Sequence, residues 1–150
     1  MGKPHVLMLT PYLPYPPVSG GRMRTYNLIK FLSADYQITL VCFGRAEEQA
    51  FDITPLAEFC EYHVIDRQSS PSTAQAAFLS LTSIQPIMMR LYTNAPMRAK
   101  LAAILDSGTV DVVHVESFYM LQNLPEARTV PVLLSEPAIE YRAWSLFAKV

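Results

Sequence analysis

The chain has 150 residues, of which 51% are apolar and 17% are charged, and this composition is sufficient for one substantial hydrophobic core. Lysine and arginine number 12 against 13 acidic residues, so the formal net charge is −1 and no overall basic field favours nucleic acid as a partner. Each apolar run is shorter than the roughly 18 to 20 residues that span a bilayer. We therefore expect one soluble domain. The apolar stretch between Pro4 and Pro11 has only six residues, which is shorter than the apolar core of a secretory signal, so we expect a cytoplasmic location.

Short apolar runs predict the strands of a buried sheet. The run HVLMLT at residues 5–10 lies between two prolines and is typical of a strand buried on both faces of a parallel sheet. The run at 130–134 is predicted as a central strand with Pro131 at its start. The complete set of expected strands is 5–10, 36–43, 62–65, 110–115 and 130–134.

Segments with helical spacing separate these runs. In the first, 21–32, the apolar residues Leu28, Ile29, Phe31 and Leu32 are expected to be buried. The remaining expected helices are one that begins at Thr54-Pro55 with Thr54 as its cap, 73–83, one from about Pro96 that ends at Gly108, a turn at 118–122, and 138–150. Alternating strands and helices predict an α/β fold with a doubly wound parallel sheet, similar to the Rossmann fold.

The cysteines and histidines give little indication of catalysis or metal binding. Cys42 and Cys60 lie far apart, with no CxxC pair and no histidine at metal-binding spacing, so we interpret them as buried thiols and expect no metal site. His114 lies within an apolar run and is interpreted as a core histidine with satisfied hydrogen bonds, in preference to a catalytic one.

The loop PYLPYPPVSGGRMR at residues 11–24 is the most informative segment for ligand binding. It follows the first expected strand, and ligands of open parallel sheets bind outside the carboxyl ends of the strands. Gly20 and Gly21 open the next helix, whose free N–H groups favour a phosphate, and Arg22 and Arg24 add positive charge. A tight turn that needs glycine for steric reasons alone explains the same residues equally well.

Two common nucleotide-binding patterns are missing from this loop. It matches neither GxGxxG nor GxxxxGK[ST]. The second expected strand ends in Phe43-Gly44-Arg45, where an NAD-binding domain places an acidic residue for the ribose. These features disfavour a dehydrogenase and an NTPase.

The order of segments resembles the N-terminal domain of glycosyltransferase family 4 (group 1). The resemblance rests on a first strand, a proline-containing loop that ends in Gly-Gly and an arginine, and a helix; on DVVHVES at 111–117; and on LLSEPAIEYRAW at 133–144. It covers nearly all of the chain. It implies a GT-B enzyme of two domains, in which residues 1–150 form the acceptor-side domain and the C-terminal donor-binding domain is absent from this chain.

The resemblance also implies the chemistry and the site. We expect a retaining, metal-independent transferase without a cofactor that moves a sugar from a nucleotide sugar to a glycan, lipid-linked or polysaccharide-precursor acceptor. Gly20, Gly21, Arg22 and Arg24 would lie near the donor phosphates. Glu116 stands where some relatives have a histidine and is the candidate catalytic base or acceptor-hydroxyl partner. Glu136 would face the same cleft and bind sugar hydroxyls, and solvated loop carboxylates remain the alternative for both glutamates.

Three further expectations concern partners and extent. Residues 84–100 combine apolar side chains with Arg90, Arg98 and Lys100, which indicates either peripheral contact with an anionic membrane or an ordinary core segment. The sequence ends within a helical pattern and without a capping signal, so the natural protein is expected to continue. A non-catalytic Rossmann-like module that binds an anionic small molecule or a protein remains the alternative function.

Overall fold

The computed structural model describes residues 2–67 and 87–136. The helices predicted at 73–83 and 138–150 therefore lie outside the described residues. The described elements, in chain order, are β1 (His5–Thr10), α1 (Gly20–Leu32), β2 (Gln37–Gly44), the 3-10 helix η1 (Ala46–Ala50), α2 (Thr54–Ala57), β3 (Glu61–Asp66), α4 (Ile87–Leu91), α5 (Ala95–Asp106), β4 (Val112–Glu116), the 3-10 helix η3 (Phe118–Asn123) and β5 (Val132–Ser135).

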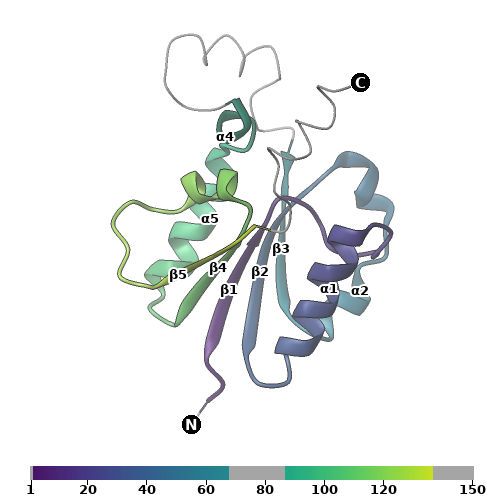
Figure 1. The fold of residues 1–150 in the computed structure, drawn as a ribbon, viewed down its shortest axis with the longest axis horizontal. Helices are drawn as coiled ribbons and strands as arrows, with labels where there is room; N and C mark the ends of the chain where they lie inside the picture. Colours follow the sequence, from purple (N-terminus) through teal and green to yellow (C-terminus); the bar gives the residue numbers. More distant parts are fainter. Residues whose placement is uncertain (1, 68–86, 137–150) are drawn as a thin grey trace, which may run out of the picture.

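The five strands form one sheet in the order β3-β2-β1-β4-β5, and every neighbouring pair is parallel (Figure 1). The predicted parallel α/β fold is confirmed. The strand run at 130–134 was expected in the sheet centre, but β5 is an edge strand of the described sheet because it pairs only with β4. The strand order reverses between β1 and β4, and this reversal is where open sheets of this kind bind ligands.

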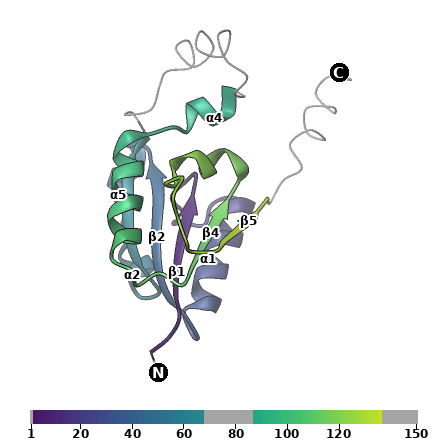
Figure 2. The same cartoon turned by 90° about the vertical axis from the view of Figure 1, so that its left-hand side faces the viewer.

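Two hydrophobic layers cover the sheet, one on each face, and Figure 2 shows α5 and α1 on opposite sides. The burial of both faces explains why β1 is buried along its whole length. The layer under α5 and η3 includes Leu7, Leu9, Val41, Phe43, Met97, Leu101, Val113, Val115 and Met120. The layer under α1 and α2 includes Met8, Leu13, Ile29, Leu40, Cys42, Leu56 and Cys60.

Helix α1 begins one residue earlier than predicted and buries a narrower face. Ser19 caps it, and both glycines that follow are helical, so they do not form a separate turn. Thr25 and Ile29 are buried, whereas Phe31 is 77% exposed, contrary to the prediction. Phe31 is two residues beyond Ile29, and two residues rotate the helix by about 200°, which directs Phe31 away from the sheet.

The start of α2 also differs from its prediction. Ile53 occupies the cap position and Thr54 is already helical, while Pro55 lies in the first turn as expected. The side chain of Asp52 accepts a hydrogen bond from the Thr54 backbone N–H at 3.0 Å. The acceptor at the start of α2 is thus the Asp52 side chain, whereas the sequence pattern had predicted the Thr54 hydroxyl.

The end of α5 depends on the predicted glycine. Gly108 follows the helix with φ at +69°, and a β-carbon there would have no atom within 4 Å. Backbone conformation, and not crowding, therefore accounts for glycine at this position.

Replacing Gly108 with alanine is expected to lower the free energy of unfolding by about 1 kcal/mol, because alanine disfavours positive φ. Urea denaturation monitored by circular dichroism measures this change. Gly20→Ala is the matched control, since Gly20 also has open space around it but lacks the positive φ. Equal stability of the two variants would contradict the explanation.

Candidate functional site

Glu116, the predicted catalytic residue, is the last residue of β4 and is fully buried. Three side chains hold its carboxylate: the Thr25 hydroxyl donates to Oε2 at 2.7 Å, Arg24 Nη1 donates to Oε1 at 2.5 Å, and the Tyr12 hydroxyl donates to Oε2 at 3.3 Å. Hydrogen bonding and the guanidinium charge together make a buried carboxylate tolerable. Its oxygens are therefore engaged by protein donors from the first loop and from α1.

The Tyr12 hydroxyl extends this arrangement toward the glycines. It lies 3.1 Å from the Thr25 hydroxyl, and burial raises the pKa of Tyr12 above its usual value of 10.0, so the phenol keeps its proton near neutral pH. A β-carbon on Gly21 would approach the Tyr12 oxygen to 3.1 Å, whereas one on Gly20 would meet nothing within 4 Å. Close packing gives a steric reason for glycine at 21, but the described structure contains no such reason at 20.

The two arginines of α1 turn to opposite sides of the helix. Arg22 pairs with Glu48 of η1, whose other carboxylate oxygen accepts from the Arg45 backbone N–H at 2.9 Å. Arg24 pairs with Glu116 and also donates to the Ser135 hydroxyl at 3.0 Å. The structure therefore does not bring Arg22 and Arg24 together above the glycines, and each already has a carboxylate partner.

Glu136 occupies a different place from Glu116. It is exposed, and its Oε2 accepts from the Phe118 backbone N–H at 3.0 Å. Ser117, between the two segments, has positive φ of 75° and its N–H donates to the Ser135 carbonyl. Glu136 thus lies at the start of η3, while Glu116 points into the layer beneath α1. The positive φ at Ser117 could not be predicted from the residue type, since the residue is not glycine.

His114 is buried as predicted, with 7% of its surface exposed, but its hydrogen bonds are not all satisfied. Among the described residues, its Nε2 has no hydrogen-bond partner, which corrects the prediction of a satisfied core histidine. Burial lowers the pKa of His114; the nearby Glu116 carboxylate opposes this shift and Arg24 reinforces it. The imidazole is therefore neutral at physiological pH.

Both cysteines are buried free thiols, as predicted. Burial raises the pKa of Cys60 to about 12 and that of Cys42 further, so neither is a ready nucleophile. Within residues 2–67 and 87–136, no group of three or more His, Cys, Asp or Glu side chains has an arrangement suited to a metal ion. The helices in these ranges include none with the length and apolarity to cross a bilayer.

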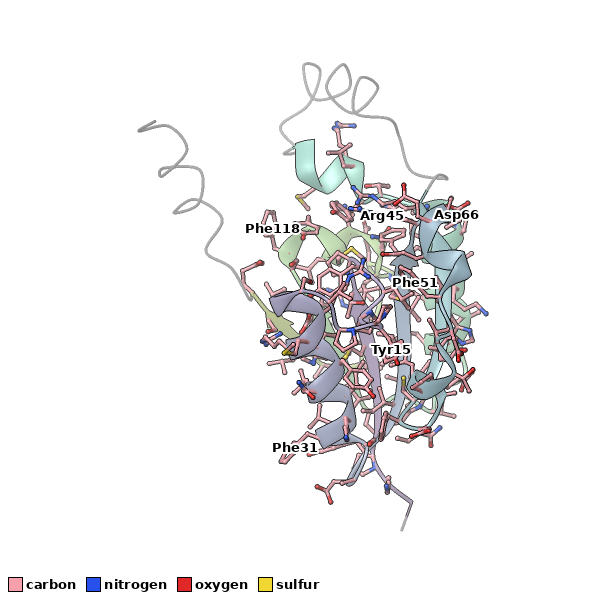
Figure 3. All side chains as sticks on the ribbon, turned by 90° about the vertical axis from the view of Figure 1, so that its right-hand side faces the viewer. Tyr15, Phe31, Arg45, Phe51, Asp66 and Phe118 are labelled. Carbon is pink, nitrogen blue, oxygen red and sulfur yellow. The ribbon has the colours of Figure 1, made fainter. Side chains whose placement is uncertain are left out.

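Two adjoining hollows lie at the carboxyl ends of β2 and β3. The smaller, which we call the arginine hollow, has a volume of about 80 Å³ and is lined by Pro11, Tyr12, Arg22, Phe43, Arg45, Glu48, Arg67 and Tyr92. The larger, which we call the apolar hollow, has a volume of about 340 Å³ and is lined by Leu13, Gly44, Arg45, Glu48, Phe51, Ile53, Val64 and Asp66. Figure 3 shows Arg45, Phe51 and Asp66 gathered at one end of the domain, with Phe31 at the other.

Sequence reasoning did not assign Arg45 or Arg67 to a binding site. Each is the residue directly after a strand, β2 or β3 respectively. Because ligands of parallel sheets bind at the carboxyl ends of the strands, the strand predictions contained the signal. The interpretation of Phe43-Gly44-Arg45 as evidence against NAD binding did not use this signal.

The segment predicted to touch a membrane is only partly described. Residues 84–86 lie outside the described residues. Met97 is fully buried, and Met89 and Tyr92 pack against the layer under α5. Much of the apolar surface of this segment therefore belongs to the core. Membrane contact stays a prediction.

No family model matches the chain, and no curated protein or solved structure matches it significantly.

Replacing Glu116 with glutamine is expected to lower the free energy of unfolding by about 2 kcal/mol, because it removes a buried carboxylate that three donors contact. The exposed Glu136 provides the control, and Glu136→Gln is expected to cost less than about 0.5 kcal/mol. Urea denaturation of Glu116→Gln, Arg24→Gln and the double variant measures the coupling between the pair. A Glu116→Gln loss as small as that of the control would contradict this arrangement.

The buried His114 is expected to make the protein less stable at acidic pH. Its folded pKa is lowered by burial, so below about 6.5, where a histidine of the unfolded chain takes up a proton, protonation favours unfolding. Its contribution is present above that pH and is lost as the pH falls toward the folded pKa.

Urea denaturation at pH 7.5 and 5.5 tests this effect. The difference in stability between the two pH values should shrink in His114→Leu. It should persist in His63→Gln, which removes a less buried histidine near the Glu61 carboxylate. An unchanged pH dependence in His114→Leu would contradict the assignment.

Proposed function

We propose that the chain is the acceptor-side domain of a GT-B glycosyltransferase that uses a nucleotide-sugar donor. One observation carries this proposal: the helix α1 starts beside the strand-order reversal with its glycines exposed. The first N–H groups of a helix have no partner within the helix and favour an anion. Among the described residues of its first turn, none is acidic, so this end keeps its positive character.

The proposal assigns different roles to the predicted site residues. Gly20 would permit close approach of the donor phosphates, and Gly21 would hold the start of α1 against Tyr12. Glu116 would act as a positioning residue, because its oxygens already accept from Arg24, Thr25 and Tyr12. A general base must reach the proton that it removes, and full burial of Glu116 favours this positioning role over proton transfer.

A second α/β domain would supply the remaining donor contacts, as the family resemblance implies. The acceptor would then enter from the side of β2 and β3, where the two hollows lie. The cytoplasmic location and the lipid-linked or polysaccharide-precursor acceptor are parts of the same proposal. The cytoplasmic location rests on the short apolar runs of the sequence, and the acceptor class rests on the family resemblance.

A non-catalytic module for an anionic small molecule is the alternative function. The arginine hollow supports this candidate directly, because three arginines line a space at the carboxyl ends of the strands. The two candidates differ in whether the exposed start of α1 takes part in sugar transfer. A substitution at that point distinguishes them.

Gly20→Val is expected to reduce sugar transfer at least tenfold in the protein translated from the complete natural reading frame. A branched side chain would obstruct the donor phosphates, while the open space around Gly20 leaves the fold intact. Product formation with a panel of nucleotide sugars measures transfer, and thermal melting verifies folding. Asn27→Val is the control, because Asn27 is exposed farther along the same helix.

Transfer by Gly20→Val at the rate of the control would refute the site assignment. Residues 1–150 alone should neither hydrolyse nor transfer from these donors at an appreciable rate, because the proposal requires a second domain. Turnover near the rates of ordinary enzymes, about 1 per second or more, would show that this chain holds a complete active site. Failure of the intact protein with every donor would favour the binding module.

A further inference from the structure

We propose that the arginine hollow and the apolar hollow together form a subsite for a phosphate ester joined to an apolar body. This inference deepens the proposed function and rests on it only in identifying the ligand as the acceptor. The two hollows share Arg45 and Glu48 in their linings. Their volumes, about 80 and 340 Å³, suit a small charged group beside a body of the size that ordinary ligand pockets hold.

Three arginines from separate parts of the fold line the arginine hollow. Arg22 comes from α1, Arg45 follows β2 and Arg67 follows β3. Guanidinium groups match phosphate oxygens through paired N–H donors and stay charged at every physiological pH. Three such side chains around one small space indicate an anionic occupant.

Two of these arginines are held in place before any ligand binds. Glu48 fixes Arg22. The guanidinium of Arg67 lies 4.3 Å from the centre of the Tyr92 ring, and this ring packs against Phe43 at 6.0 Å between centres. Positions fixed in advance reduce the ordering cost of binding.

The charge balance within the hollow favours an anion. Among the described lining residues, Glu48 alone is acidic, and its charge is matched by Arg22. Asp66 is exposed and lines the apolar hollow, and Glu47 is exposed beside Arg45 and outside both hollows. Beyond the matched pair of Arg22 and Glu48, Arg45 and Arg67 therefore leave the lining of the small space with a positive charge.

The apolar hollow supplies the second half of the recognition. Its walls include Leu13, Ile53, Phe51 and Val64, and the last two are 41% and 40% exposed. An exposed apolar wall that continues from a cationic space fits a ligand whose charged end is joined to an apolar body. A free inorganic anion would leave this wall uncovered.

Phenyl phosphate is a simple probe for this chemistry, and isothermal titration calorimetry on the 150-residue chain measures its binding. We expect phenyl phosphate to bind at least tenfold more tightly than inorganic phosphate. Arg45→Gln and Arg67→Gln should each weaken phenyl phosphate about tenfold, equivalent to about 1.4 kcal/mol. The control is Arg128→Gln, since Arg128 is exposed and donates to the Pro125 carbonyl away from both hollows.

Phe51→Ser separates the two halves of the subsite. It should weaken phenyl phosphate at least fivefold and leave inorganic phosphate unchanged, because it alters only the apolar wall. Equal affinity for the two probes, or binding that neither Arg45→Gln nor Phe51→Ser weakens, would overturn the proposal. Arg45 and Phe51 are exposed at the rim, so these variants should fold even if Arg67→Gln does not.

A vesicle-binding experiment identifies the natural source of the phosphate ester. The protein is sedimented with phosphatidylcholine vesicles that contain phosphatidic acid and with vesicles of phosphatidylcholine alone. Sedimentation with the first kind only, and its loss in Arg45→Gln, would assign the ester to a lipid headgroup. Absence of sedimentation would assign it to a soluble ester. Phenyl phosphate binding by a protein that transfers no sugar would support the subsite and refute the transferase. Transfer without that binding would refute the subsite alone.

Discussion

The buried carboxylate of Glu116 determines how α1 lies against the sheet. It terminates β4, yet its donors come from the loop after β1 and from α1, between 91 and 104 residues earlier: Tyr12, Arg24 and Thr25. A buried charge without partners costs several kcal/mol, so the fold is strongly favoured only when these parts meet. These contacts of Glu116 lie beside the reversal of strand order, and they fix the start of α1 at the crevice.

The contacts of Glu116 also divide the crevice into two halves that differ in charge. Arg22 and Arg24 are two residues apart and therefore point about 200° apart around α1. Arg24 is drawn to Glu116 and Ser135 on the β4 side, where its charge is matched by a fully buried carboxylate. Arg22 faces the β2 side, where Arg45 and Arg67 add further positive charge. On the β4 side the charge of Arg24 is neutralised by an ion pair, whereas the β2 side stays open to an anion.

The sequence predicted most of the fold and much less of the site. The strands and helices could be predicted from the periodicity of apolar residues, because burial of a sheet or helix face repeats at fixed spacing. Helix-terminating residues such as Gly108 marked their ends. Phe31 was misplaced because it is apolar in a helix that buries only a narrow face. The 3-10 helix η1, which positions Glu48, was not predicted, since its five residues are too short for a periodic signal. Thr25 carried no signal of its role, because its partner Glu116 is 91 residues away.

The polar residues on the α1 face of β4 show where this domain departs from simple core packing. His114 and Glu116 alternate with Val113 and Val115, so both polar side chains lie on the face that α1 covers. In the described part of the chain the buried Nε2 of His114 has no hydrogen-bond partner, and such a group costs about 1 to 3 kcal/mol.

An apolar residue at position 114 would avoid that cost, and in the neighbouring strand β1 the residue paired with His114 is the apolar Met8. His114, which carries this free-energy cost, lies beside the strand-order reversal and next to the Arg24–Glu116 pair. Natural folds tolerate local violations of packing rules chiefly where function requires them. The neutral imidazole and the pair of Arg24 with the buried Glu116 carboxylate thus form one polar unit. The arginine hollow, which Arg22 lines, lies on the opposite side of α1 from Arg24.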